Sequence, residues 1–332
     1  MEKTKVAMIG CGGRNKVHLD KLTAIPEVEF VGFCDVVPEK AEAFRAVAGE
    51  GRVFSNHTDL LNSVDPDVVY IAVPPHQHGA IEFAVIEKGC HFMVEKPMAL
   101  EYETAEKIWN AAKAKNLITG VGFQDRYQDL TIRMKEYLKD RKVGLVQAAW
   151  MGGIPGVAWW RTQATCGGQI VEQNIHLYDQ LRYLFGEVKT VYCRAEKGIV
   201  EPDSAEYNVP GYDLEDYSSA VLTFENGVIA NVFTSCYHRP GSVTDSGMTV
   251  YAKNATLRYK LRNSLDITDE TGTYETMHRG EEQTGIMDRT FIAAIRSGDT
   301  SGILSDYGDA LKSLKLVLAC NRSIETGKPV EL

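Results

Sequence analysis

In Val6-Ala7-Met8-Ile9-Gly10-Cys11-Gly12-Gly13-Arg14-Asn15, a run of apolar residues ends in a glycine-rich turn. The run indicates a strand over Lys5–Ile9, and the residues after the turn predict a helix near Lys16–Ala24. A second strand is expected at Glu29–Cys34, directly before Asp35. Strands that alternate with helices in this way predict parallel βαβ units.

The glycine turn has the spacing of a dinucleotide-binding loop. Gly10 would make the tight turn, and Gly12 would let a pyrophosphate approach the backbone at the helix N-terminus. Asp35 follows Gly10 by about twenty-five residues, where a carboxylate can bind the adenosine ribose. Such a carboxylate favours NAD over NADP, although Arg14 could still reach a 2′-phosphate. The alternative is a plain turn with a strand-end cap. The predicted cofactor residues here are Gly10, Gly12, Gly13, Arg14, Asn15 and Asp35.

The rest of the chain divides into two parts. Further βα units are expected as far as residue 122, whereas strands follow one another without intervening helices in the second half. Glu225-Asn226-Gly227 predicts a tight hairpin, because Asn-Gly tolerates positive φ. The predicted fold is α/β, with a Rossmann domain at 1–122 and an α+β domain at 123–332. The second domain would carry a large, open, mainly antiparallel sheet, and closing helices within 284–326 could pack back on the first domain.

The composition excludes several classes of protein. With 332 residues, 44% of them hydrophobic and 24% charged, the chain has the profile of a two-domain globular protein. A net charge of −9 disfavours nucleic acid as a partner, because phosphate binding needs a basic surface. No apolar run reaches the ~20 residues of a membrane span, and the N-terminus does not resemble a signal peptide. The seven scattered cysteines contain no CxxC pair, so we expect reduced thiols in a cytoplasmic protein.

Three further motifs carry a resemblance to a known family. Val73-Pro74-Pro75-His76-Gln77-His78 and Glu95-Lys96-Pro97 follow predicted strands, and Gly167-Gly168 precedes His176 and Asp179. Over nearly the whole chain, these motifs resemble the Gfo/Idh/MocA oxidoreductases, which include glucose–fructose oxidoreductase and inositol dehydrogenase. The resemblance implies an NAD(P)-dependent dehydrogenase of sugars, cyclitols or related polyols. It also implies a homodimer or homotetramer formed through the C-terminal sheet.

The resemblance also assigns roles to individual residues. It places Pro74 and His78 on the nicotinamide side of the cofactor. It makes Glu95 and Lys96 the acid and the lysine of the family, and it puts Arg126 near the substrate or the cofactor. The sequence departs from the family pattern at three positions, which are Asn15 in place of a small residue, His76 in place of a common Asn, and Glu172 in place of the usual Asp.

Oxidation of a secondary alcohol needs a base for the hydroxyl proton and a positive group that stabilises the developing alkoxide. Lys96 fits the second role, because Pro97 restricts its backbone and ligands bind at the carboxyl end of open α/β sheets. An exposed loop lysine is the alternative. His176 is the predicted base, since its neutral form is available near neutral pH.

A single helix over Ile170–Leu184 would place Glu172, His176 and Asp179 on one face at i, i+4 and i+7. Glu172 would then orient the imidazole and assist catalysis, and Asp179 would bind a substrate hydroxyl. A solvated polar stripe is the alternative. A metal site on this face is disfavoured, because the chain contains no HExxH motif.

Candidate substrate contacts precede this helix. Trp160 could stack on a sugar ring while Arg161 binds its hydroxyls, with Trp159 beside them. The alternative is that both tryptophans pack in a core or an interface. A second candidate set ends a predicted strand: Tyr237, His238 and Arg239.

Three functions are compatible with these sequence features. The favoured one is an NAD-dependent dehydrogenase with a small-molecule sugar, inositol or polyol substrate. The second is an NAD-assisted glycosidase, in which transient oxidation allows elimination of the aglycone. The third is a non-catalytic dinucleotide sensor, which is disfavoured because Lys96 and His176 are both present.

Overall fold

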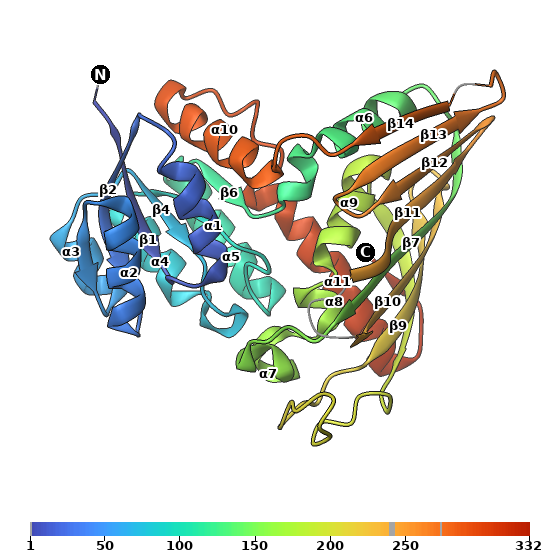
Figure 1. Ribbon diagram of the computed structural model, residues 1–332, viewed down its shortest axis with the longest axis horizontal. Helices are drawn as coiled ribbons and strands as arrows, with labels where there is room; N and C mark the ends of the chain where they lie inside the picture. Colours follow the sequence, from blue (N-terminus) through green and yellow to red (C-terminus); the bar gives the residue numbers. More distant parts are fainter. Residues whose placement is uncertain (1, 239–242, 273) are drawn as a thin grey trace. The chain divides into compact units, whose positions relative to one another are not determined.

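The computed structural model describes residues 2–238, 243–272 and 274–332, which fall into two compact units (Figure 1). The first unit contains the chain up to Tyr127 together with Glu282–Leu311. The second contains Gln128–Glu281 and Lys312–Leu332.

The first unit is built on a six-stranded parallel sheet with the order β3-β2-β1-β4-β5-β6. The connections change direction between β1 and β4, and ligands bind at such a switch point in open α/β sheets. All of β4 is buried, which explains its continuous apolar sequence. The strands are β1 (Thr4–Ile9), β2 (Val28–Cys34), β3 (Arg52–Phe54), β4 (Val68–Ile71), β5 (His91–Val94) and β6 (Thr119–Val121).

The helices of the first unit cover this sheet (Figure 1). They are α1 (Gly13–Leu22), α2 (Pro38–Ala48), α3 (His57–Ser63), α4 (Ala80–Lys88), α5 (Tyr102–Ala114) and α10 (Gln283–Ser297), with 3₁₀ turns η1 (Pro75–Gln77) and η2 (Gln124–Tyr127). Helix α10 comes from late in the chain, and its Met287 and Phe291 share a buried core with Leu19 and Leu22 of α1. Helix α1 begins at Gly13, earlier than predicted, because the glycine turn itself supplies the first helical turn.

The second unit contains a nine-stranded sheet with the order β14-β13-β12-β11-β7-β10-β9-β8-β15. Neighbouring strands are antiparallel except β7 and β10, so the predicted fold class is confirmed. The predicted hairpin is also confirmed, with Gly227 at φ +89° between β9 and β10. The strands are β7 (Val143–Gly153), β8 (Val188–Glu196), β9 (Tyr217–Phe224), β10 (Ile229–His238), β11 (Val243–Ala252), β12 (Ala255–Lys260), β13 (Ser264–Asp269), β14 (Tyr274–His278) and β15 (Val330–Glu331).

Helices lie on one face of this sheet, among them α6 and α9 (Figure 1). Side chains alternate along its strands, as in β9, where buried and outward positions follow one another. No helix in the described ranges is long and apolar enough to cross a membrane. The helices are α6 (Asp129–Leu138), η3 (Ala158–Arg161), α7 (Gln163–Cys166), α8 (Gln169–Glu172), α9 (Ile175–Phe185) and α11 (Tyr307–Thr326), whose first turn belongs to the first unit.

The prediction of one helix over Ile170–Leu184 was wrong, because the structure has α8 and α9 there. The amide of Asn174 donates to the carbonyl of Gln169, five residues back, and the amide of Leu177 donates to Asn174, three residues back. These bonds break the regular i→i−4 ladder and turn the face of α8 relative to that of α9. Glu172 therefore ends one helix, and His176 lies in the first turn of another.

Candidate active site

The glycine turn is forced by close backbone packing at the switch point. Gly10 has φ +84°, and its amide donates to the carbonyl of Cys34 at 2.8 Å. A Cβ at this position would lie 2.2 Å from the carbonyl oxygen of Ala72, which follows β4. Only glycine can therefore connect β1 to α1 by this path.

The next part of the turn is open. A Cβ added to Gly12 or Gly13 would meet no heavy atom of the described residues within 4 Å. Gly12 is the N-cap of α1 and provides no side-chain cap, so the first amides of the helix keep their capacity to bind an anion. This combination of open space and helix N-terminus fits the pyrophosphate of a dinucleotide.

Asp35 links the second strand to the glycine turn. One carboxylate oxygen accepts from the amide of Cys11 at 2.8 Å, and the other accepts from the amide of Val37 at 2.9 Å. Its carboxylate is thus fixed beside the open turn. Neighbouring Val36 is 87% exposed and leaves an apolar surface next to this carboxylate.

Asn15, predicted to contact the cofactor, instead points inward. Its side chain is buried, and Nδ2 donates to the carbonyls of Gly10 at 2.7 Å and Ile9 at 3.1 Å. A weaker bond of 3.4 Å joins Nδ2 to the carbonyl of Tyr70. Asn15 therefore supports the turn from beneath, in the space that a small third residue would leave open.

Arg14 leads from the glycine turn to the end of β5. Its Nη2 and Nε donate to Oε1 of Glu95 at 2.7 and 3.0 Å. Because β5 and β2 lie on opposite sides of β1, Arg14 is directed away from Asp35. This differs from the expectation that Arg14 could reach a 2′-phosphate near Asp35.

Glu95 and Asp288 of α10 bind the two nitrogens of one buried imidazole, His18. Nε2 lies 3.1 Å from Glu95 Oε1, and Nδ1 lies 2.8 and 2.9 Å from the carboxylate oxygens of Asp288. Burial lowers the pKa of His18, but Asp288 and then Glu95 outweigh it and raise the pKa to about 9. Burial would raise the pKa of Glu95, yet Arg14 and His18 hold it well below its usual range. Neither His18 nor Asp288 was singled out from the sequence, since 270 residues separate them.

Lys96 follows this cluster directly. Its amide donates to Oε2 of Glu95 at 3.3 Å, its side chain is half-buried, and its bond to Pro97 is cis. The lysine therefore leaves the carboxyl end of β5, two strands from the glycine turn. Pro74 lies half-buried after β4, at the same edge of the sheet.

Two predicted ligand contacts in the first unit are occupied by internal bonds. The imidazole of His78 is 1% exposed and its Nδ1 lies 2.6 Å from Glu82, which also accepts from the amide of Gly79. The guanidinium of Arg126 is buried and donates to the carbonyl of Leu304 at 2.6 Å. Its Nη1 also lies 2.5 Å from Asp309. Both side chains are therefore held by the scaffold, and their contact with cofactor or substrate stays a prediction.

In the second unit, His176 lies in the first turn of α9 and is 7% exposed. Its ring stacks on Trp150 of β7, with 6.3 Å between ring centroids and 13° between planes. The guanidinium of Arg262 lies 5.7 Å from the Trp150 ring. Trp150 and Arg262 were not predicted from the sequence, because they come from strands and turns far along the chain.

Glu172 has a different partner from the one predicted. Its Oε2 accepts from Nε1 of Trp160 at 2.6 Å, and Trp160 is fully buried in a core with Cys166 and Cys236. Trp160 therefore cannot offer its ring to a sugar, and the alternative of core packing holds for it. Trp159 packs against the same core.

The remaining predicted substrate contacts that the structure describes lie in the second unit. Asp179 is buried and accepts from the hydroxyl of Ser313 at 2.6 Å, which joins α9 to α11, and its contact with a substrate stays a prediction. Arg161 is half-buried, and its carbonyl accepts from the amide of Asp213. Tyr237 and His238 stack with 5.0 Å between ring centroids, and Arg239 lies outside the described residues.

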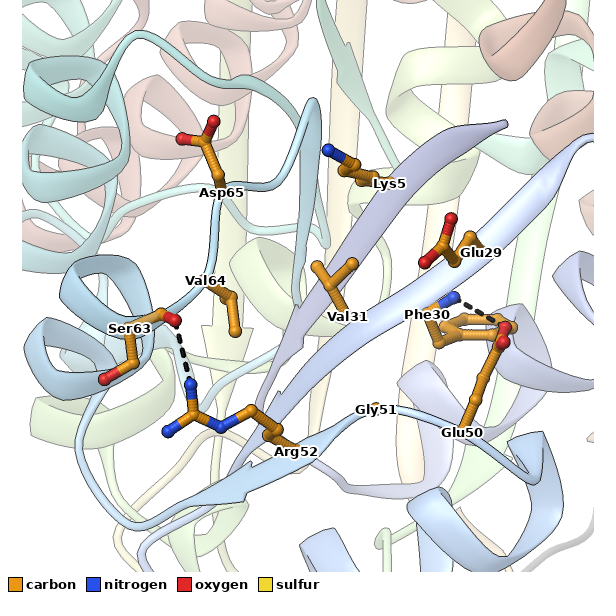
Figure 2. A pocket seen from close by; sticks show the side chains of 10 residues that line it. All are labelled: Lys5, Glu29, Phe30, Val31, Glu50, Gly51, Arg52, Ser63, Val64 and Asp65. Carbon is orange, nitrogen blue, oxygen red and sulfur yellow. Dashed lines mark hydrogen bonds between the residues drawn. The ribbon is translucent and has the colours of Figure 1, made fainter. Parts of the chain in front are cut away.

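Other features of the chain do not add to the site. All seven cysteines are buried and free. In the described part of the chain, no group of three or more His, Cys, Asp or Glu residues could hold a metal ion. Figure 2 shows a hollow at the amino ends of the strands, at the edge opposite the glycine turn. There Arg52 donates to the carbonyl of Ser63 at 2.9 Å, and Glu50 accepts from the amide of Phe30 at 2.8 Å.

The fold and the open glycine turn define a dinucleotide-binding oxidoreductase. The chain belongs to the GFO/IDH/MocA family: residues 4–123 match its NAD-binding Rossmann domain, and residues 132–258 match its C-terminal domain. The predicted family and the predicted NAD cofactor are thereby confirmed.

Named relatives are similar over most of the chain. A D-glucoside 3-dehydrogenase of Escherichia coli (strain K12) is 28% identical over 70% of this chain and 70% of its own. A myo-inositol 2-dehydrogenase of Thermotoga maritima is 21% identical over 99% of this chain and 98% of its own. Among solved structures, levoglucosan dehydrogenase in complex with NADH and levoglucosan has a TM-score of 0.86 at 20% identity, over 99% of both chains. At this identity the structural likeness supports the shared fold.

Proposed function

We propose that this protein is an NAD-dependent dehydrogenase that transfers hydride between a secondary alcohol of a sugar, inositol or related polyol and nicotinamide. The observation that carries the proposal is the open Gly12–Gly13 turn at the N-terminus of α1, at the same sheet edge as Lys96. Relatives named as glucoside and inositol dehydrogenases support the substrate class.

In this proposal Lys96 and His176 carry separate parts of the chemistry. When bound, NAD supplies the hydride acceptor. His176 accepts the hydroxyl proton, and the Lys96 ammonium stabilises the alkoxide that develops on the oxygen. The carbinol carbon then becomes a carbonyl carbon, so two electrons and one proton leave as hydride and a second proton stays on the imidazole. Stacking on Trp150 fixes the plane of this imidazole.

The test measures reduced nicotinamide formed from NAD and a panel of polyols. Lys96→Met and His176→Asn should each lower kcat by about a hundredfold or more while NAD binding is retained. Lys113→Met, an exposed lysine on α5, is the matched control and should leave kcat unchanged. If the two residues serve the same reaction step, the double variant should lose less than the product of the single losses.

Two outcomes would contradict this assignment. Turnover by Lys96→Met at the wild-type rate would exclude the lysine from the chemistry. Tightly held NAD without net reduction, together with release of the aglycone from a glycoside, would instead indicate the glycosidase.

We further propose a homo-oligomer that pairs the outward face of the nine-stranded sheet. Along this face lie Leu145, Val221, Ile229, Phe233 and Tyr251, each 39–42% exposed. They sit on the adjacent strands β11, β7, β10 and β9, so this face carries apolar side chains in neighbouring rows, with Asn231 and Gln147 between them. Light scattering should show a smaller mass for Phe233→Asp. Phe83→Asp, equally exposed on α4 of the first unit, is the control, and an unchanged mass for Phe233→Asp would refute the interface.

A further inference from the structure

His18 occupies a buried position between two carboxylates. Its side chain is 1% exposed, and those of Glu95 and Asp288 are 5% and 0% exposed. Both ring nitrogens lie within 3.1 Å of a carboxylate oxygen. A neutral imidazole has only one N–H, so its other nitrogen would place a lone pair against a carboxylate. The geometry therefore requires an imidazolium when both acids are ionised.

The four charges described for this cluster balance one another. His18 and Arg14 contribute two positive charges, and Glu95 and Asp288 contribute two negative charges. Tyr70 of β4 packs on the His18 ring at 5.2 Å, and its pKa is raised by burial and then by the charge of Asp288, so it stays neutral. Balanced pairing is what makes buried charges tolerable, because an unpaired charge would be strongly destabilising.

Glu95 connects this cluster to the candidate catalytic lysine. Through Oε1 it accepts from Arg14 and His18, and through Oε2 it accepts from the amide of Lys96. A Cβ on Gly122 would lie 2.7 Å from Glu95 Oε1, so a glycine there leaves room for the carboxylate. The carboxylate is therefore held by four donors and has little freedom to rotate.

We propose that His18 is a positioning residue of this enzyme: paired with Asp288, its imidazolium fixes the Glu95 carboxylate and thereby the backbone from which Lys96 reaches the substrate. The proposal rests on the proposed role of Lys96. Helix α1 would then have two roles in the site. The N-terminus of the helix faces the open cofactor turn, and its inner face, through Arg14 and His18, holds the acid beside the lysine.

The first experiment compares Asp288→Asn with wild type and with Asp20→Asn. Asp20 lies on the outer face of α1 in an exposed pair with Lys16, which makes it a matched control. Without the Asp288 charge, His18 should lose its second proton near neutral pH, and Lys96 should be less well placed. We expect kcat at pH 8 to fall about tenfold or more, KM for NAD to change less than threefold, and the alkaline limb of the pH–kcat profile to move toward neutral pH.

A second readout does not depend on turnover. Histidine-selective NMR, with His18 assigned by its loss in His18→Gln, should show both ring nitrogens protonated at pH 8 in wild type and one in Asp288→Asn. Lysine-selective ¹³C labelling, with Lys96 assigned in Lys96→Met, should show a shifted Cε resonance in Asp288→Asn and an unshifted one in Asp20→Asn. If wild type turned over no polyol, the dehydrogenase proposal would fail, while these spectra would still decide the positioning role.

A third variant covers the case in which Asp288→Asn does not fold. His18→Met combined with Asp288→Leu replaces the pair by apolar side chains, which buried ion pairs often tolerate. This double variant should fold and show the same loss of kcat. The proposal is overturned if His18 titrates near pH 6.5 in wild type, or if a folded variant keeps both the wild-type kcat and the wild-type Lys96 resonance.

Discussion

Two glycines of the same turn, Gly10 and Gly12, should respond differently to replacement by alanine: the first change should affect folding and the second cofactor binding. In Gly10→Ala, the new Cβ would lie 2.2 Å from the carbonyl oxygen of Ala72, at φ +84°. The left-handed backbone costs a side chain roughly 1–2 kcal/mol, and relief of the clash with a backbone carbonyl costs roughly 1–3 kcal/mol more. Gly10→Ala should therefore lower the free energy of unfolding by about 2–5 kcal/mol.

Gly12→Ala should keep the stability of wild type and weaken NAD binding. Gly12 has φ −92°, which alanine adopts readily, and its Cβ would meet no heavy atom of the described residues within 4 Å. Its unfolding free energy should stay within about 0.5 kcal/mol of wild type. The methyl group would occupy the space assigned to the pyrophosphate, so NAD affinity should fall about tenfold or more.

The assay combines thermal unfolding with titration of NAD by calorimetry. Gly10→Ala should melt roughly 5–15 °C below wild type, whereas Gly12→Ala should melt at the wild-type temperature and bind NAD weakly. Unchanged NAD affinity in Gly12→Ala would refute the placement of the pyrophosphate. A wild-type melting temperature for Gly10→Ala would refute the packing argument.

Three further predictions follow from single contacts. The pKa of His18 is raised from about 6.5 to about 9, so its protonation contributes about 3 kcal/mol to the free energy of unfolding. This contribution is fully present below pH 6.5 and is lost as the pH rises through 9. Urea unfolding of wild type and His18→Gln at about pH 6.5 and 9.5 would show this, and an equal stability difference between the two proteins at both pH values would contradict it. Asp35→Ser should lower NAD affinity about tenfold and narrow the preference for NAD over NADP, measured by calorimetry with both cofactors; an unchanged ratio would remove Asp35 from the ribose site. Trp160→Phe removes the donor to Glu172 and should destabilise the fold by about 1–2 kcal/mol in chemical denaturation. Because the two side chains share a 2.6 Å bond, its effect should be non-additive with that of Glu172→Gln, and additive losses would contradict this pairing.

The first unit was largely predictable because its signals are local. The apolar run into Gly10 and the buried β4 each specify a strand within a few residues. The short β3 and helix α3 were missed, since a three-residue strand gives no usable pattern. The break between α8 and α9 was also missed, because hydrophobic periodicity continues through Asn174 while the hydrogen-bond ladder does not.

The candidate site was predictable only where one sequence segment carries the chemistry. Lys96 and its neighbour Glu95 could be identified from three consecutive residues. Their support could not, because Asp288 lies on a helix whose packing against α1 depends on the tertiary fold. The internal partners of His78 and Arg126 could not be predicted either, since the sequence shows a polar side chain but not whether an internal partner already binds it.

Two of the three departures from the family pattern, Asn15 and Glu172, are matched by an internal contact. Asn15 fills the space below the glycine turn, and its Nδ2 bonds to Gly10 and Ile9 hold the loop that a glycine would leave unsupported. Glu172 is one methylene longer than the usual Asp, and it ends on the indole nitrogen of a buried Trp160. A change back to the family residue at either position would leave a buried donor without its acceptor or a cavity without its side chain, at a cost of about 1–3 kcal/mol. These contacts favour a scaffold role for Asn15 and Glu172, and Lys96 and His176 remain the groups proposed to meet the substrate.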